Sequence, residues 1–200
     1  MEQVYSTGKD SALVYWAGEL SVSPEDARAL TRRDTKKGNK WRREVEEFWD
    51  LDIDARSGKI FFLPKKNLVV NSGLQTSLDR LLNIGGPPGA LVRMGVDNGV
   101  SNPVAGDTQS GANTKTLLAF DSTPTRASQT VTSIRTFTNS NVNFIMKRLF
   151  LSRHTADITN STSADTAGTL YSMTNVFTID FTGISSWSLV FSATVTATGS

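Results

Sequence analysis

The residues best suited to chemistry in this sequence are one histidine and three aspartates in loop-like stretches. His154 stands in LSRHTADIT, and the sequence contains no second histidine and no cysteine. A transition-metal cluster needs several such ligands, so this class of site is implausible here. Asp97, Asp107 and Asp121 lie among turn residues, but their spacing does not match an EF-hand loop and gives calcium little support. We therefore expect no metal site and no cofactor.

Two further patterns could serve a reaction, and neither is complete. Residues 83–90 (NIGGPPGA) are rich in glycine but lack the Lys-Ser/Thr pair of a phosphate-binding loop, and the two prolines make a stiff connector. No Ser/His/Asp or paired-carboxylate arrangement stands out in a chain with so much serine and aspartate. The sequence predicts a protein that is not an enzyme and that works through contacts with other molecules.

Charge divides the chain into two parts. Residues 1–66 hold 13 Lys/Arg and 12 Asp/Glu, whereas residues 67–200 hold only 8 and 7. Serine and threonine follow the opposite trend, with 35 of them in residues 101–200. The net charge of the whole chain is only +2, which favours neither nucleic acid nor a membrane as partner. We expect a charged unit, residues 1–66, and a second domain, residues 67–200, that meet near Pro64–Asn67.

Nothing in the sequence indicates export or a membrane. The first twenty residues carry acids and lack a continuous apolar segment, so they do not resemble a signal peptide. No window reaches about 18 consecutive apolar residues, the length that a membrane-spanning helix needs. The absence of cysteine suits a protein that is made in a reducing cytoplasm.

The N-terminal unit is expected to be partly helical. Ser23–Leu30 (SPEDARAL) combines a capping serine, a proline at the first helical position and an acid three residues after the cap. Gly38 should interrupt the helical structure, and a second helix should run from about Asn39 to Trp49. A strand is expected over Lys59–Leu63. The second helix would carry one apolar stripe, made of Trp41, Val45, Phe48 and Trp49.

Charge is also segregated within this unit. Residues 32–43 hold seven basic residues and one acid, and residues 44–54 hold six acids and no base. Three interpretations stay open: a solvated helix face with local ion pairs, a surface that docks on a neighbouring subunit, and a nucleic-acid contact weakened by the adjacent acids. Two tryptophans at helical spacing in a charged extension favour a docking arm. Its candidate residues are Arg32, Arg33, Lys36, Lys37, Lys40, Trp41, Arg42, Arg43, Glu44, Glu46, Glu47, Phe48 and Trp49.

Alternating apolar and polar residues predict β-strands in the second domain. The sequence predicts a mainly β fold: an antiparallel β-sandwich with one short helix, preceded by the charged, partly helical N-terminal arm. The short helix should include Leu74–Leu82, capped by Asn71 or Ser72, and should close an open end of the sandwich or cover an edge strand. The expected strands lie at 91–96, 114–120, 129–139, 141–151, 170–181 and 186–198.

The threonine-rich faces of these strands admit two interpretations. Threonine keeps the branched shape that suits a sheet, so such a face can meet solvent or be buried against copies of the same protein. The second domain contains one tryptophan, Trp187, and one tyrosine, Tyr171. Trp187 lies on an apolar strand face, where we expect it to be buried. Few aromatic side chains would then be exposed for stacking on a host glycan.

From Asn67 onward, the order of motifs resembles that of a loosely defined group of tailed-bacteriophage virion proteins. The similar parts are an N-x-V-x-N-x-G-L start at Asn67–Leu74, the Leu-rich helix, and the Gly/Pro connector. The loop in MGVDNGVSNPVAGDT (Met94–Thr108) and the closing strands from VFTIDF onward are also similar. The segment after Thr108, QSGANTK, departs from the Leu-x-x-Glu-x-x-Arg continuation of that group, and residues 1–66 match none of it.

The resemblance implies a structural subunit of a phage virion, assembled in the host cytoplasm, whose partners are other virion proteins and copies of itself. We expect a ring or trimer at the neck or tail of the particle, docked through residues 1–66. Two alternatives stay open: a decoration or cement protein on the exterior of the head, and a module that binds a host glycan. No membrane partner is expected, and nucleic acid is not favoured.

Overall fold

The mainly β fold predicted from the sequence is confirmed, with two antiparallel sheets and two helices in the part of the chain that the structure describes. The predicted helix at Leu74–Leu82 and the connector at 83–90 lie outside the described residues. The computed structural model describes residues 11–69, 91, 93–111, 113–128, 130–163, 165 and 169–198.

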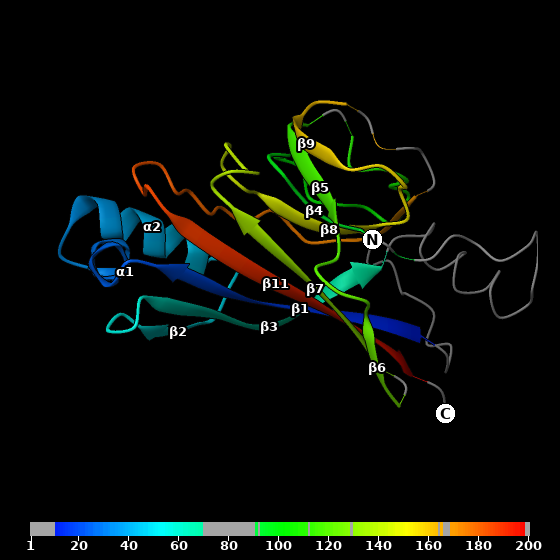
Figure 1. Ribbon diagram of the computed structural model, residues 1–200, viewed down its shortest axis with the longest axis horizontal. Coiled ribbons are helices and arrows are strands. Elements are labelled where there is room, and N and C mark those ends of the chain that lie inside the picture. The colour runs from blue at the N-terminus through cyan, green and yellow to red at the C-terminus, as the bar shows by residue number, and fades with distance from the viewer. Residues whose placement is uncertain are drawn as a thin grey trace, which may run out of the picture.

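The first sheet has six strands in the order β6-β7-β11-β1-β3-β2, and every neighbouring pair is antiparallel. The longest ladder joins β1 and β11, from Ser11 opposite Thr198 to Val22 opposite Trp187. These two strands run side by side along most of the molecule (Figure 1). The strands of this sheet are β1 (Ser11–Val22), β2 (Leu51–Asp54), β3 (Lys59–Val69), β6 (Thr125–Ala127), β7 (Thr130–Thr138) and β11 (Trp187–Thr198).

The second sheet has five strands in the order β10-β8-β4-β5-β9. It is joined to the first sheet by β3, because Leu68 and Val69 at the end of β3 pair with Met173 and Ser172 of β10. The strand β3 therefore takes part in both sheets. The strands of the second sheet are β4 (Arg93–Asp97), β5 (Lys115–Ala119), β8 (Arg148–Ser152), β9 (Ile158–Ser161) and β10 (Leu170–Met173).

The described part of residues 1–66 belongs to the sandwich, which corrects the prediction of a separate arm. Strand β1 lies inside the first sheet, between β11 and β3. Strand β3 continues through Pro64, where the sequence predicted the end of a strand and a domain boundary. The proline is tolerated because the pairing of β3 with β1 shifts register between Trp16 and Gly18, at the same place. The change in composition near residue 66 is therefore not a boundary of folding.

Helix α1 (Pro24–Thr31) begins as predicted. Ser23 is the N-cap residue, and its hydroxyl accepts a hydrogen bond from the backbone N–H of Asp26 at 3.0 Å. Pro24 occupies the first helical position, where its missing N–H leaves no hydrogen bond unmade.

Helix α2 (Lys36–Glu46) begins earlier than predicted, after the N-cap residue Thr35. Gly38 does not interrupt it but lies in its first turn. A Cβ at this position would lie 2.1 Å from the carbonyl oxygen of Arg32 at the end of α1. Glycine thus allows the two helices to approach closely, and this explains its place inside a helix.

Trp49, just after α2, anchors the helices in the core. Its side chain is 1% exposed. Its ring centroid lies 5.6 Å from that of Phe62 in β3 and 6.0 Å from that of Phe191 in β11. The ring of Phe177, which follows β10, lies 5.8 Å away. One side chain therefore joins the helices, the inner face of the first sheet and the segment that follows the second sheet.

Candidate interaction surfaces

The predicted docking residues do not form a single surface. Trp41 and Trp49 are buried, and Phe48 packs against the same core cluster. The apolar stripe predicted for the second helix exists, but it faces this chain's own sheets and not a partner. The other predicted residues lie on the outside of the helices, exposed or half-buried: Arg32, Arg33, Lys36, Lys37, Lys40, Arg42, Arg43, Glu44, Glu46 and Glu47.

Several of these charges are paired locally. The Arg32 guanidinium donates to Asp34 at 2.9 Å, and this hydrogen bond lowers the pKa of Asp34 to about 2. Arg42 pairs with Glu46 one turn along α2. An i,i+4 pair on a helix, such as Arg42–Glu46, is worth roughly 0.2–0.5 kcal/mol. These local pairs fit the interpretation of a solvated helix face.

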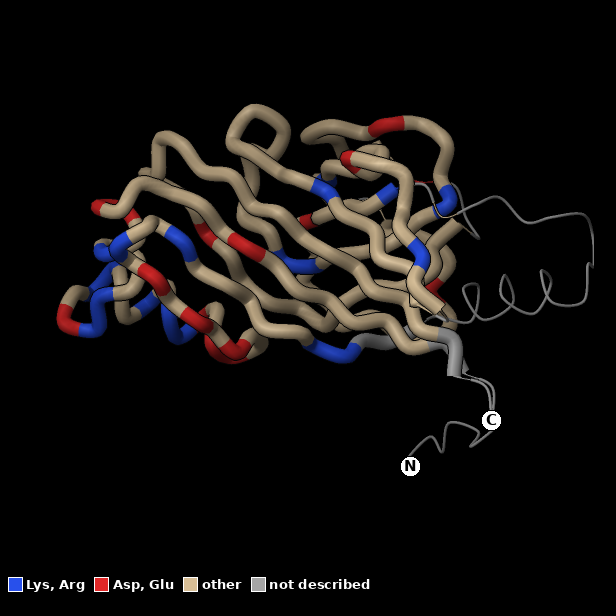
Figure 2. Tube along the Cα trace, turned by 60° about the horizontal axis from the view of Figure 1, so that its bottom comes forward, with Lys and Arg blue, Asp and Glu red and all other residues tan. Residues whose placement is uncertain are grey.

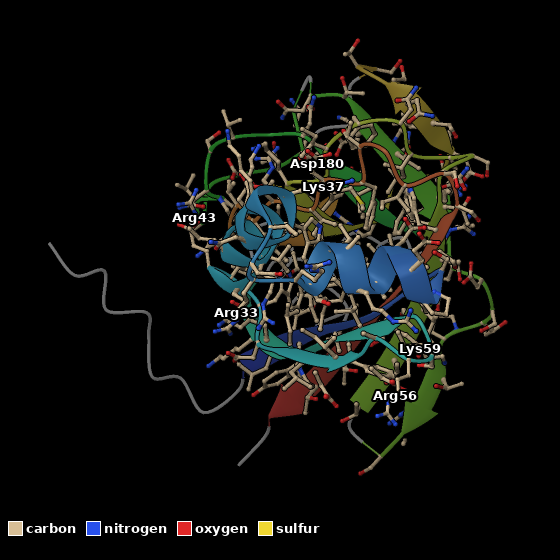
Figure 3. The ribbon with its side chains drawn as sticks, turned by 90° about the vertical axis from the view of Figure 1, so that its left-hand side faces the viewer. Arg33, Lys37, Arg43, Arg56, Lys59 and Asp180 are labelled. Carbon is tan, nitrogen blue, oxygen red and sulfur yellow. The ribbon has the colours of Figure 1, made fainter. Side chains whose placement is uncertain are left out.

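The remaining basic side chains are spread over this end of the molecule. Lys37 and Arg43 form no ion pair with any described residue. Figure 3, which looks at the end of the molecule that carries the helices, shows Arg33 and Arg43 on one side and Arg56 and Lys59 on another. They do not gather into one basic stripe of the kind that follows a phosphate backbone.

The outer face of the first sheet, across β7, β11 and β1, is nearly free of charge. We call this surface the threonine face. Glu19 is its one charged residue, and Lys59 Nζ pairs with the Glu19 carboxylate at 2.6 Å. Figure 2 shows the long strands almost without charge, while the helical end carries many charges of both signs. The face consists of five rows across the strands: Thr130–Thr196–Leu13, Thr132–Thr194–Tyr15, Ile134–Ser192–Ala17, Thr136–Val190–Glu19 and Thr138–Ser188–Ser21.

Threonine hydroxyl groups on this face bond to one another across the strands. The oxygen atoms of Thr130 and Thr196 lie 3.2 Å apart, and those of Thr132 and Thr194 lie 3.3 Å apart. Cross-strand pairs of this kind stabilise a sheet and hold the side chains in fixed positions. Ile134, in the middle row of the face, is 40% exposed. Depletion of charge and exposed apolar groups are features of surfaces that other proteins cover.

Two ion pairs are buried within the second sheet and form one network, the buried charge cluster. Arg148 in β8 bonds to Asp97 in β4 through both ends of the carboxylate, at 2.8 and 2.9 Å. Lys115 Nζ in β5 lies 2.9 Å from the carboxylate of Asp165. Ser110 links the pairs: its N–H and hydroxyl donate to Asp165, and its carbonyl accepts from Arg148. All five residues are less than 5% exposed.

The buried charge cluster fastens the loop between β4 and β5. Arg148 also donates to the carbonyl of Ser101, and Lys115 donates to the carbonyl of Gly111. Residues from both halves of the loop are thus tied to the sheet by side chains that solvent does not reach. Because each buried charge has an opposite charge as partner, we interpret the cluster as structural.

No such cluster was predicted from the sequence, although the sequence contains a signal for it. Lys115 stands in TKTLLAF and Arg148 in FIMKRLFL, both within strands whose other residues are mostly apolar. A charged residue in a buried strand needs a partner, so these positions predict acidic partners elsewhere. The partner Asp165 could not be chosen among the seven acids of the second half from sequence alone.

Of the residues first considered for chemistry, Asp97 belongs to the buried charge cluster, and the others make contacts outside it. The carboxylate of Asp107 accepts from the N–H of Val104, and that of Asp121 accepts from Arg135 and Thr136. His154 is half-buried between β8 and β9. In the described ranges, no group of three His, Asp or Glu residues is placed to hold a metal ion.

The pKa values of the two buried carboxyl groups in the cluster, Asp97 and Asp165, are shifted in opposite directions. Burial raises the pKa of Asp97, and the hydrogen bonds from Arg148 and Gly99 offset this only in part. Burial also acts to raise the pKa of Asp165, but hydrogen bonds from Lys115 and Ser110 together outweigh it. The pKa of Asp165 therefore falls below its ordinary value of 3.8.

Replacing each of these carboxyl groups by an amide is expected to change the pH dependence of stability in opposite senses. The lowered pKa of Asp165 contributes stability that is present above 3.8 and is lost as pH falls through the folded-state pKa. The raised pKa of Asp97 acts oppositely, because the folded protein holds this proton more tightly, and stability falls as pH rises from 3.8 to the raised pKa.

Urea unfolding between about pH 3 and about pH 7 measures both effects. Relative to the parent protein, Asp165→Asn should flatten the loss of stability on acidification, whereas Asp97→Asn should make that loss steeper. A change of slope in the same direction for both variants would contradict the opposite shifts.

No helix in the described part of the chain is long and apolar enough to cross a membrane. Comparison with protein-family models, curated proteins and solved structures finds no match for this chain.

Proposed function

We propose that this protein is a non-enzymatic structural subunit of a tailed-phage virion, which assembles with copies of itself as a ring or trimer at the neck or tail. The observation that carries the proposal is the threonine face. Fifteen side chains across three long strands include one charged residue, in a chain that is 20% charged. Exposed sheets of monomers commonly carry more charge, which keeps other chains away.

The threonine face suits burial against a second protein surface. Its residues are mostly small or branched, so a partner can approach closely without stranding a buried charge. The hydroxyl pairs Thr130–Thr196 and Thr132–Thr194 already provide hydrogen-bond partners, which lowers the cost of removing water from them. Glu19 is matched by Lys59 of the same chain. A second copy is the partner we propose.

The place in a phage particle is supported by the resemblance of residues 67–200 to virion proteins. In this proposal the exposed charges of α1 and α2 contact neighbouring virion proteins through complementary charge. The alternative is a position on the exterior of the head. Reconstruction of intact particles separates the two: few copies at the neck or tail support our proposal, and many copies over the shell support the alternative.

A lysine in the middle of the threonine face is expected to weaken self-association. Thr194 lies in β11, the central strand of the face. Thr194→Lys would therefore place a buried charge on each subunit's side of the interface. The association constant, measured by sedimentation equilibrium, should fall at least about ten-fold, because burying an unpaired charge costs more than 1.4 kcal/mol.

The matched control is Thr159→Lys, an exposed threonine in β9 of the second sheet. It should leave association unchanged, and both variants should keep the thermal unfolding of the parent protein. A parent protein that stays monomeric at every accessible concentration would refute the proposal. So would equal association of the Thr194→Lys variant and the parent.

A further inference from the structure

A depression lies at the end of the sandwich, where α1 and β11 begin. It consists of two adjoining cavities of 340 and 680 Å³, and we call the pair the end cleft. Asn139 and Trp187 line both cavities. The Asn139 side chain donates a hydrogen bond to the carbonyl of Ser185 at 3.2 Å, which ties together two of the loops that form the cleft.

The smaller cavity has an aromatic wall. The rings of Phe181 and Trp187 pack at 4.3 Å between centroids, with 31° between their planes. Trp187 is buried, as the sequence predicted, and Phe181 is half-buried and lines the cavity. Phe144 and Ile145 complete the apolar lining. Trp187 thus holds the Phe181 ring in place at the cavity wall. This wall was not predicted from the sequence, where only Trp and Tyr were considered for stacking on a sugar.

Unused hydrogen-bonding groups lie beside the aromatic wall. One carboxylate oxygen of Asp180 accepts from the N–H of Thr182 at 2.8 Å, and the other has no hydrogen-bond partner among the described residues. The side-chain amide of Asn143 likewise has none in the described part of the chain. These groups line the cavity together with Phe181. A ligand there would find both donors and acceptors next to an apolar ring.

The larger cavity is lined mainly by hydroxyl groups and acids. Six of its lining residues are serine or threonine, and Glu25 and Asp26 are acidic. No Lys, Arg or His is among the described residues that line either cavity. Lys37 reaches the loop next to the cleft, since its Nζ lies 3.4 Å from where a Cβ on Gly183 would be, and Figure 3 shows it near Asp180. The cleft as a whole remains acidic.

We propose that the end cleft binds a neutral saccharide. A sugar ring has an apolar face, which matches Phe181, and hydroxyl groups, which match the amide, carboxylate and hydroxyl groups around it. Hydrogen bonds from sugar hydroxyls to Asp180 and Glu25 would be charge-assisted and strong. The same carboxylates would repel a phosphorylated or carboxylated sugar, because no cation lines the cleft to pair with it.

The test uses the full-length protein on an array of neutral and acidic oligosaccharides, followed by calorimetry with the best neutral ligand. Binding should favour neutral sugars, and Phe181→Ala and Asn143→Ala should each weaken it at least about ten-fold. Asn143 is exposed and its side chain makes no hydrogen bond with the described residues, so Asn143→Ala tests the site even if Phe181→Ala fails to fold. Phe61→Ala, a half-buried phenylalanine of β3 outside the cleft, is the matched control.

Three results would overturn the proposal. The first is no binding of any neutral saccharide up to about 10 mM, where even weak specific sites are occupied. The second is binding that both cleft variants leave unchanged. The third is preference for an acidic sugar or for a basic peptide, which would make the cleft a site for a different ligand. Ser21, Thr138 and Ser188 belong both to the last row of the threonine face and to the lining of the larger cavity, so the two surfaces meet there. Thr194, Phe181 and Asn143 lie outside this shared row, so their variants test the two proposals separately.

Discussion

A chain that lacks residues 1–49 is expected to lose the cooperative unfolding transition of the whole protein. The deletion removes β1, α1, α2 and Trp49. Strand β1 pairs with β11 on one side and β3 on the other, so its removal splits the first sheet in two. The split would expose two long unpaired strand edges, which recruit other chains.

The deletion also removes large buried side chains from the core. Trp16 and Leu20 of β1 are completely buried, and Trp49 is 1% exposed. Truncation of a single buried tryptophan or leucine typically costs about 2–5 kcal/mol, and a whole domain is stable by only about 5–15 kcal/mol. Loss of three such side chains is therefore enough to unfold the rest.

Thermal unfolding followed by near-ultraviolet circular dichroism and by calorimetry measures this directly. The truncated chain should show no cooperative transition and should aggregate. Arg43→Ala, which removes an exposed side chain of α2 without an ion pair among the described residues, should change stability by less than about 0.5 kcal/mol. If the truncated chain unfolded cooperatively near the melting temperature of the parent protein, residues 1–49 would be a separate arm, as the charge pattern suggested.

Arg148→Met is expected to destabilise the protein by about 3–5 kcal/mol. The Arg148 guanidinium is the partner of Asp97, the last residue of β4, which is completely buried. Without Arg148 the carboxylate would keep, among the described residues, only the hydrogen bond from the N–H of Gly99. Removing one member of a buried pair leaves a charge in a medium that solvates it poorly, and this costs more than the pair contributes.

The double variant with Asp97→Asn separates the charge effect from the loss of packing. Because the second change removes the stranded charge, the double variant should be more stable than Arg148→Met alone. The loss of stability in Arg148→Met should also become smaller as pH falls, because burial already raises the pKa of Asp97 and a protonated carboxyl group needs no charged partner. Chemical unfolding of the four proteins at two pH values gives all these quantities. If Arg148→Met cost the same unfolding free energy in the parent protein and in the Asp97→Asn variant, the stranded charge would not be the cause of the loss.

Local signals allowed several elements to be predicted from the sequence. The start of α1 was readable because Ser23 and Pro24 form a cap that depends on neighbouring residues only. Strand β11 was readable because its apolar residues alternate over its whole length. The strands predicted at 141–151 and 170–181 were too long, since only β8 and β10 form there. The rest of each segment is loop, and its backbone forms hydrogen bonds with residues distant in the sequence.

The place of residues 11–66 could not be predicted, because their partners are distant in the sequence. The charges of this segment suggested an arm, yet its strand β1 depends on β11 for most of its pairing. The stripe of Trp41 and Trp49 was recognised, but a stripe does not state whether it faces the same chain or another. The phenylalanines of the end cleft gave no signal either, since Phe144 and Phe181 stand in loops that only the fold brings together.

The pairing of β1 with β11 also has a consequence for how the protein is made. The ribosome releases β1 early and β11 late, so the middle of the first sheet stays open until synthesis has passed nearly all the other strands. Contacts this distant in the chain slow folding, because a long loop must close before they form. Until β11 is made, the edge of β1 that faces it has no partner, and Val14, Trp16 and Leu20 lack part of the cover that they have in the folded protein. A chaperone that shields such a segment would raise the yield of native protein.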